Sequence, residues 1–308
     1  MDTLTQIALG AAVGEATLGR QIGRKAMLWG GICGLFPDLD VLVPLGDAVK
    51  NFTYHRGPSH SLFVLAALTP LFVYVILKLY PQTARYRIRW YALVYLAFAT
   101  HVLLDSLTVY GTQILWPLST PPVMWSTIFI IDPAYTLPLL VACIALAGWP
   151  ARPAAHTTLV VALVLSTTYV AWSWVAKSIV ERDARVALAR KGLDDAPLFS
   201  VPTPFNTLLW RVVVLTDEGH AEGFDSLLLE EGQMRFEFFV SDKQALEEAQ
   251  DLWAVGRLRW FADDFVRADV VDDRLIISDL RMGAEPKLVF RHAVAERGNP
   301  VWEPIPTE

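Results

Sequence analysis

Residues 60–80 read HSLFVLAALTPLFVYVILKLY and form a nearly unbroken apolar run. Within this run only Lys78 carries a fixed charge. An α-helix needs about 20 apolar residues to cross the hydrocarbon core of a bilayer. This stretch therefore predicts a membrane-spanning helix.

Comparable apolar runs surround this helix. The long ones are Trp90–Tyr110, Thr127–Trp149 and Thr157–Lys177. Two shorter ones precede it, Leu4–Gly19 and Met27–Phe36, and the first of these is rich in Gly and Ala, which suits close helix packing. The pattern predicts a mainly α polytopic membrane bundle of about six hydrophobic segments over residues 1–177, the first two short enough to be re-entrant.

The charge is distributed unevenly along the 308 residues. Residues 1–176 hold ten Lys/Arg and seven Asp/Glu, whereas residues 177–308 hold sixteen and twenty-five. Overall 54% of the residues are hydrophobic and 19% are charged, against roughly 25% charged in an average soluble domain. This composition excludes a disordered chain and a basic nucleic-acid-binding domain, so no nucleic-acid partner is expected. Two cysteines, Cys33 and Cys143, are too few for a disulfide scaffold.

Basic residues in the loops orient the predicted bundle. If the segments alternate across the membrane, eight of the ten basic residues fall on one face: Arg20, Arg24, Lys25, Lys78, Arg85, Arg87, Arg89 and Arg152. The positive-inside rule makes that face cytoplasmic. We therefore expect a multi-pass membrane protein whose loops 46–59 and 111–126 and C-terminal tail lie outside, in a periplasm-like compartment.

The tail has a different character from the bundle. Residues 178–204 predict a charged helix followed by a Pro-rich linker, and residues 205–308 predict a soluble α+β domain. Gln244–Val255 has helical spacing. The expected strands are Leu208–Leu215, Gly223–Leu229, Arg235–Val240, Phe265–Val271, Arg274–Leu280 and Lys287–His292. The tail contains no catalytic motif, and its His220 and His292 are isolated.

Ionisable side chains inside the apolar half are costly to bury, so each one points to a function. His101 and Asp105 stand four residues apart, which puts both on one face of a helix, in its outer half. Such a pair can bind one metal ion. The alternative is a neutral His hydrogen-bonded to an Asp in a polar patch of the bundle.

Asp38 and Asp40 follow a proline in the sequence FPDLD. Proline disfavours helix at the residue before it, so the helix ends part-way through the bilayer, where irregular backbone must line a cavity. Two carboxylates in such a turn make a cation site. The alternative is an interfacial loop whose acids are solvated.

The string HRGPSHS places His55 and His60 on either side of a Gly-Pro turn. The turn can bring both rings to one point, Ser59 is expected to cap the following helix, and Arg56 to pair with a phosphate or carboxylate. Two ordinary surface histidines are the alternative. Taken together, the three elements predict a metal site with six ligands: Asp38, Asp40, His55, His60, His101 and Asp105.

The ligand types narrow the choice of metal. Imidazole with carboxylate suits zinc, with manganese and iron as alternatives. Six ligands exceed what one catalytic zinc takes from a protein. The site could therefore hold two divalent ions, or one ion that some of the six residues bind directly while the others hydrogen-bond to those ligands.

At these residues the sequence resembles the YdjM-like family of bacterial inner-membrane proteins, which are regarded as metal-dependent hydrolases and are LexA-regulated in some members. The matching strings are Pro37–Asp40, His55–Leu62, His101 with Asp105, Ile131–Pro133, Thr136–Pro138 and Pro204–Arg211. The likeness covers residues 1 to about 215 and implies hydrolase chemistry in the inner membrane. Members often carry a His in the first segment where this chain has Gln6.

We interpret the chain as a membrane-bound metal-dependent hydrolase that uses a metal-activated water on a lipid or lipid-linked phosphoester. Arg56 would stabilise an anionic substrate group, and Asp132 would act as an outer-shell group or general base. The rival hypothesis is a metal-ion or proton transporter that uses the same cluster as a transit site. The sequence shows no internal repeat, which favours a dead-end site. Substrate, ion count, oligomeric state and the role of the tail stay open.

Overall fold

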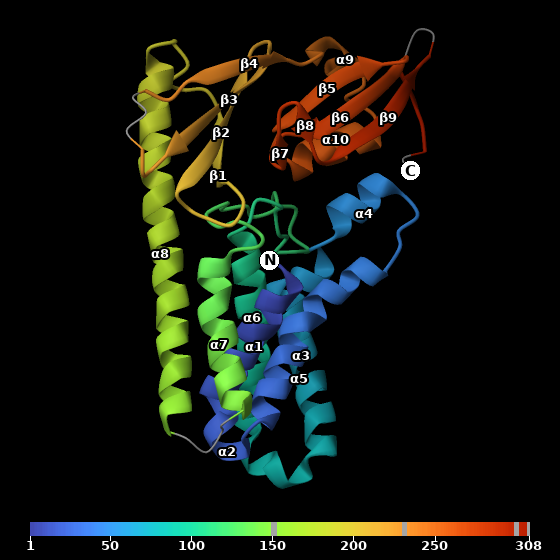
Figure 1. Cartoon of the computed structure of the whole chain (residues 1–308). Coiled ribbons are helices and arrows are strands. Elements are labelled where there is room, and N and C mark those ends of the chain that lie inside the picture. Colours follow the sequence, from blue (N-terminus) through green and yellow to red (C-terminus); the bar gives the residue numbers. More distant parts are fainter. Residues whose placement is uncertain (149–152, 230–232, 299–301, 307–308) are drawn as a thin grey trace.

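The computed structural model describes residues 1–148, 153–229, 233–298 and 302–306. A helical bundle carries two antiparallel sheets at one end, and one long helix, α8 (Pro153–Ala189), runs beside both parts (Figure 1). The bundle contains α1 (Thr3–Gly14), α2 (Arg20–Ile22), α3 (Lys25–Leu35), α5 (Leu62–Leu79), α6 (Arg87–Ser106) and α7 (Pro133–Gly148). Trp149 and Arg152 of the sequence analysis lie outside the described residues.

Glycines bring α1 and α3 into backbone contact. A Cβ atom added to Gly10 would collide with the carbonyl oxygen of Gly30, and one added to Gly30 would collide with that of Gly10. Gly14 and Gly34 extend the same contact along both helices. Small residues therefore make the close helix packing that the composition of the first segment indicates.

The prediction of a six-span bundle is wrong. Among the described residues, two helices are long and apolar enough to cross a membrane, Leu62–Leu79 and Thr157–Ala189. Helices α1 and α3 have 12 and 11 residues, and α7 has 16 because the chain before Pro133 is not helical. Helix α6 has 20 residues, but Arg87, Arg89 and Asp105 make it too polar for a span. Apolar runs in the sequence overstate helix length because they continue into irregular segments.

Short irregular helices connect these elements and position the polar residues. Three are of the 3-10 type: Phe36–Leu42 (η2), Pro58–His60 (η3) and Pro81–Tyr86 (η4). Glu15–Gly19 (η1) is a π-helix, and α4 (Ala48–Tyr54) lies between η2 and η3. Pro37 at the start of η2 follows α3 directly and ends its α-helical geometry, as expected for a ring that removes a backbone donor, and Pro58 begins η3 after a three-residue turn.

The tail is built from two four-stranded antiparallel sheets. The first has the order β1-β2-β3-β4: Leu198–Pro202, Leu209–Thr216, Gly219–Ser226 and Phe236–Val240. The second has the order β10-β9-β6-β5: Trp302–Pro304, Arg291–Arg297, Arg274–Asp279 and Val266–Val271. A small hairpin pairs β7 (Gly283–Ala284) with β8 (Lys287–Leu288). The Pro-rich stretch contains β1, and the expected helix Gln244–Val255 is two helices, α9 (Lys243–Glu248) and α10 (Trp253–Phe261).

Both sheets pack on elements from the first half of the chain or on α8. Val180 and Ala184 of α8 share a buried core with Trp210 of β2. Val49 and Phe52 of α4 lie in the core of the second sheet. The loop region between α3 and α5 is therefore joined to the tail, while α8 connects the tail to the bundle.

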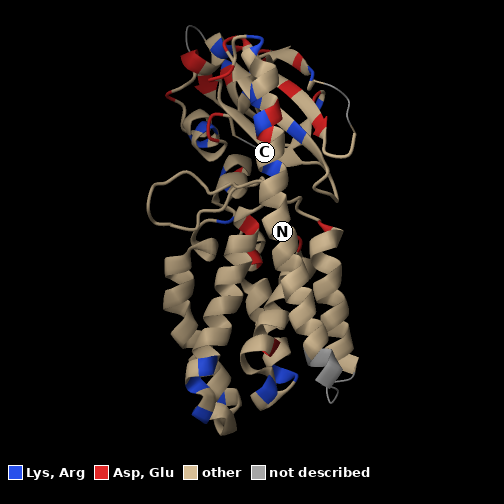
Figure 2. Ribbon diagram, turned by 90° about the vertical axis from the view of Figure 1, so that its left-hand side faces the viewer, with Lys and Arg blue, Asp and Glu red and all other residues tan. Residues whose placement is uncertain are grey.

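Charge is segregated along the molecule. Lys and Arg gather at the end of the bundle far from the sheets, the middle of the bundle is largely uncharged, and acidic residues appear at the end near the sheets (Figure 2). A cluster of His and Asp side chains lies at this acidic end, where η2, η3 and the end of α6 meet.

Candidate metal centre

Four of the six predicted ligands come together in the structure. Asp38, His60, His101 and Asp105 each offer one donor atom, and these atoms all lie within 4.8 Å of one another. Asp38 comes from η2, His60 from η3, and the other two from one face of α6. His60, His101 and Asp105 are buried, and 16% of the Asp38 side chain is exposed. Asp38 is therefore the cluster member through which solvent can approach.

Five of the six distances between the donor atoms are close to the edge length of a tetrahedral metal site, and the two carboxylate oxygens lie within 4.8 Å of each other. The Nε2 atoms of His60 and His101 lie 3.2 Å apart. Asp105 Oδ2 lies 3.1 Å from the first and 3.4 Å from the second, and Asp38 Oδ1 lies 3.5 Å from both. For metal–ligand distances of about 2.0–2.2 Å, the ligands of a tetrahedral site lie about 3.3–3.6 Å apart. These four residues thus fit a divalent cation that accepts two imidazoles and two carboxylates.

The outer nitrogens of both rings have partners that orient them. His101 Nδ1 lies 2.7 Å from the carbonyl oxygen of Gly34, which can only accept, so this nitrogen carries the proton. Ser59 donates its hydroxyl to Asp40 at 2.6 Å and lies 2.9 Å from His60 Nδ1, whose N–H it can therefore accept. Both Nε2 atoms are left with a lone pair facing the cluster, which is the arrangement that a metal-binding histidine requires.

Asp105 is the most enclosed member of the cluster. Its Oδ2 faces the two histidines, while Oδ1 accepts from Gln6 Nε2 at 3.0 Å and lies 3.3 Å from Arg56 Nη2. The amino group of Met1 also contacts Oδ1. The Arg56 guanidinium and the Gln6 amide therefore offset the cost of burying this carboxylate.

Asp40 and His55 lie beside the cluster and bind each other. Asp40 Oδ1 lies 2.9 Å from His55 Nδ1, and Oδ2 accepts the backbone N–H of Arg56 at 3.0 Å. Burial alone would raise the pKa of Asp40, but the hydrogen bond and charge of His55 outweigh burial and lower it. Asp40 therefore stays ionised and connects His55, through Ser59, to His60.

The two residues predicted for catalysis occupy different places. Arg56 is buried, has a left-handed backbone with φ 58°, and lies near Asp105 and Thr108, with its guanidinium 5.1 Å from the Tyr110 ring centre. Asp132 accepts the backbone N–H of Ala134 at 3.1 Å, at the start of α7, and the Tyr169 hydroxyl at 2.8 Å. Arg56 thus contacts Asp105 of the cluster. Among the described residues, the hydrogen-bond partners of Asp132 belong to α7 and α8 and not to the cluster.

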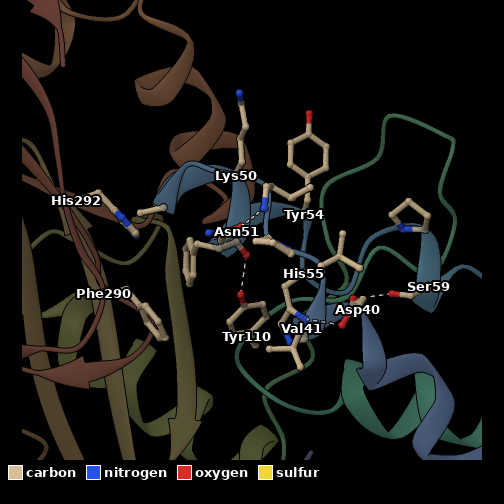
Figure 3. A pocket seen from close by; sticks show the side chains of 16 residues that line it. Asp40, Val41, Lys50, Asn51, Tyr54, His55, Ser59, Tyr110, Phe290 and His292 are labelled. Carbon is tan, nitrogen blue, oxygen red and sulfur yellow. Dashed lines mark hydrogen bonds and ion pairs between the residues drawn. The ribbon is translucent and has the colours of Figure 1, made fainter. Parts of the chain in front are cut away.

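Several contributing residues have little signal in the sequence. Ser61, rather than Ser59, caps α5 by accepting from the Val64 backbone, which frees Ser59 to bridge Asp40 and His60. The Gly34 carbonyl is recognisable only from its position across the helix contact, whereas Gln6 has a signal in the sequence, since it stands where family members often carry a His. His292, isolated in the sequence, lines a pocket with His55 (Figure 3).

Comparison with known proteins gives two matches. Residues 1–180 match the family described as YdjM inner membrane protein. The chain is also 25% identical over 223 residues to the "Uncharacterized protein YfhP" of Bacillus subtilis (strain 168). That alignment covers 70% of this chain and 65% of the length of the relative. No solved structure matches. The family match includes all four cluster residues and both candidate membrane helices up to residue 180.

Proposed function

Because the chain belongs to the YdjM inner membrane protein family and its cluster suits a divalent cation, we propose that this membrane protein is a metal-dependent hydrolase. The observation that carries the proposal is the pair of histidine Nε2 atoms, 3.2 Å apart and facing two carboxylates. Zinc is the proposed metal, since mixed imidazole and carboxylate ligands suit it.

When bound, the metal ion would lower the pKa of a water molecule toward neutrality and polarise the bond to be cut. The chain's own residues would hold the site in a reactive form. Gly34 and Ser59 accept the Nδ1 protons of His101 and His60, which leaves the Nε2 atom of each ring unprotonated toward the cluster. Arg56 balances the charge of Asp105. No proton transfer is assigned to Asp132, because both of its oxygens already accept hydrogen bonds.

The proposed substrate is a lipid or lipid-linked phosphoester. His60 precedes the first residue of the membrane helix α5 by two positions, so the cluster would lie where the apolar part of the bilayer ends. Lipid ester and phosphate groups lie at this depth. A phosphoester anion would also be attracted to the metal and to Arg56, whose guanidinium lies beside the cluster.

We place the cluster and the tail outside the cytoplasm. The support is the gathering of Lys and Arg at the opposite end of the bundle, which the positive-inside rule assigns to the cytoplasm (Figure 2). A fluorescent protein that matures only in the cytoplasm, fused after Glu308, should stay dark, and alkaline phosphatase at the same position should be active. The reverse pair of signals would contradict this orientation.

The hydrolase activity itself is tested on the purified full chain in detergent. Release of phosphate or head group from a panel of lipid phosphoesters should need a divalent cation and should stop with chelator. Asp105→Asn should lose about 100-fold or more, since loss of a direct ligand costs more than the 10–100-fold typical of outer groups. Asp132→Asn is the matched control and should keep most of the activity. Equal turnover in both variants would contradict the proposal.

A further inference from the structure

A pocket of about 1080 Å³ lies beside the metal cluster, where the bundle meets the tail (Figure 3). Its lining includes Asp40 and Ser59, the two residues that hold His60, but not the four cluster residues. The pocket thus adjoins the cluster through Asp40 and Ser59. Its volume is slightly above the usual range for small-molecule sites, roughly 300–1000 Å³.

One wall of the pocket is an apolar segment that is exposed to its surroundings. Val41, Leu42 and Val43 are 70%, 73% and 61% exposed, and Val41 and Val43 line the pocket. Exposed apolar runs of this kind mark a binding surface or contact with a membrane. The segment follows Asp38 and Asp40 directly, so it lies at the same end of α5 as the cluster, next to the proposed bilayer surface.

The opposite wall comes from the tail. Phe290 packs on Phe52 of α4 with ring centres 4.6 Å apart, and His292 packs on the same ring at 5.3 Å. Tyr110 donates its hydroxyl to the Phe52 carbonyl at 2.6 Å and also lines the pocket. The pocket therefore depends on the docking of the tail against α4, which gives the tail a role.

The inner end of the pocket is polar. His55 and Ser59 both bind Asp40 there, at 2.9 Å and 2.6 Å. A ligand that fills this pocket would need an apolar part against Val41 and Val43 and a polar part near Asp40 and His55. An amphiphile from the neighbouring bilayer has this chemistry.

We infer that the pocket binds an acyl chain of a membrane phospholipid and that the tail forms one wall of this site. The identification of the lipid as a substrate rests on the proposed hydrolase function. The binding of the acyl chain does not rest on that function, because the pocket lining includes none of the four cluster residues.

The test uses the full chain in vesicles of phosphatidylethanolamine and phosphatidylglycerol. The probe is a phosphatidylglycerol with a diazirine at the end of one acyl chain, and labelled peptides are mapped by mass spectrometry. Labelling is expected in the segment 40–59 and near Phe290, in addition to the lipid-facing surfaces of α5 and α8. Val41→Trp should lower pocket labelling about ten-fold, the loss expected when roughly two methylene groups are kept out of an apolar site.

Val240→Trp is the matched control, because Val240 is also 70% exposed but lies on β4, at the edge of the first sheet, outside the pocket lining. It should leave pocket labelling unchanged. Labelling confined to α5 and α8, or equal pocket labelling in both variants, would overturn the inference. His101→Ala separates the two proposals: it should abolish turnover but keep pocket labelling. Pocket labelling without turnover in the wild-type protein would reject the hydrolase alone, and turnover without pocket labelling would reject the lipid pocket alone.

Discussion

The Ser59 hydroxyl orients the His60 ring. Ser59 donates to Asp40 and accepts from His60 Nδ1, so its removal leaves the ring free to rotate and to change tautomer. Such outer groups typically contribute 10–100-fold to metal affinity. We predict a loss of this size for Ser59→Ala in competitive zinc titrations of the purified protein.

Ser178→Ala is the control, because the Ser178 hydroxyl binds only the Trp174 carbonyl on the exposed side of α8 among the described contacts. It should leave zinc affinity unchanged. An unaltered affinity in Ser59→Ala would show that the hydroxyl does not orient the His60 ring.

Glu222 makes the stability of the first sheet depend on pH. Burial alone would raise its pKa, but the nearby His220 ring, 3.7 Å away, and the hydrogen bond and charge of Arg211 outweigh burial and lower the pKa to about 2. A lowered carboxyl pKa stabilises the fold at pH above the unfolded value, about 4.5, and this stability is lost as the pH falls toward 2. We predict a loss of about 3 kcal/mol of unfolding free energy between pH 6 and pH 2 from this group.

Urea unfolding of the full chain, followed by near-ultraviolet circular dichroism, measures this loss at each pH. Glu222→Gln should flatten the pH dependence. Glu237→Gln should not, because Glu237 pairs with Glu222 in register but is exposed. Equal pH profiles for both variants would contradict the assignment.

At the scale of elements, the glycine contact between α1 and α3 also supports the metal cluster. Gly34 lies in this contact and its carbonyl accepts from His101. Gly10→Ala would place a methyl group against the Gly30 carbonyl, so the helices must separate. Overpacking of this kind costs about 1–3 kcal/mol, and we predict lower thermal stability together with weaker zinc binding.

Gly148→Ala is the matched control, since a Cβ atom at Gly148 has no described atom within 4 Å. It should preserve both thermal stability and zinc affinity. A fully stable Gly10→Ala protein would show that the two helices pack less closely than described here.

Element types were easier to predict from the sequence than their lengths. The four-residue spacing of His101 and Asp105 and the proline after Phe36 place three of the cluster residues without any structure. The six spans failed because hydropathy does not show where a helix ends: the run from Thr127 becomes helical only at Pro133. Asp40 and His55 share the residue types of ligands, but their mutual hydrogen bond depends on a turn geometry that spacing does not fix.

At the scale of the whole molecule, the tail is held to the membrane half through α4. Arg257 of α10 donates to the Thr53 hydroxyl and to the Thr53 carbonyl, both at 2.9 Å, and its guanidinium stacks on Tyr54. Hydrogen bonds from a charged group are worth about 1.5–3 kcal/mol. We predict that Arg257→Ala raises amide hydrogen exchange of residues 48–54 at least about ten-fold while metal content is unchanged.

Arg259→Ala provides the comparison on the same helix. Arg259 pairs with Asp264 at 2.7 Å within the tail and is partly exposed, so α4 should keep its protection. Equal exchange of residues 48–54 in both variants would place the attachment of the tail elsewhere.

The sequence gives no sign of this attachment. Residues 46–59 read as a loop between membrane segments, yet Val49 and Phe52 complete the core of a sheet formed some 200 residues later. Contacts of such sequence separation leave no local periodicity, so only the assembled structure identifies them. The same contacts create the pocket that adjoins the cluster.

Across the whole molecule, we expect Asp38, His60, His101 and Asp105 to bind one divalent ion. Metal analysis of the detergent-purified protein, combined with X-ray absorption spectroscopy, tests it most directly. We predict about one equivalent of metal per chain, with two imidazole and two oxygen ligands at about 2.0–2.2 Å. Asp105→Asn and His101→Ala should lose the ion, and Asp132→Asn and His292→Ala should retain it. Metal content that is absent in the wild-type protein, or the same in all four variants, would contradict the account.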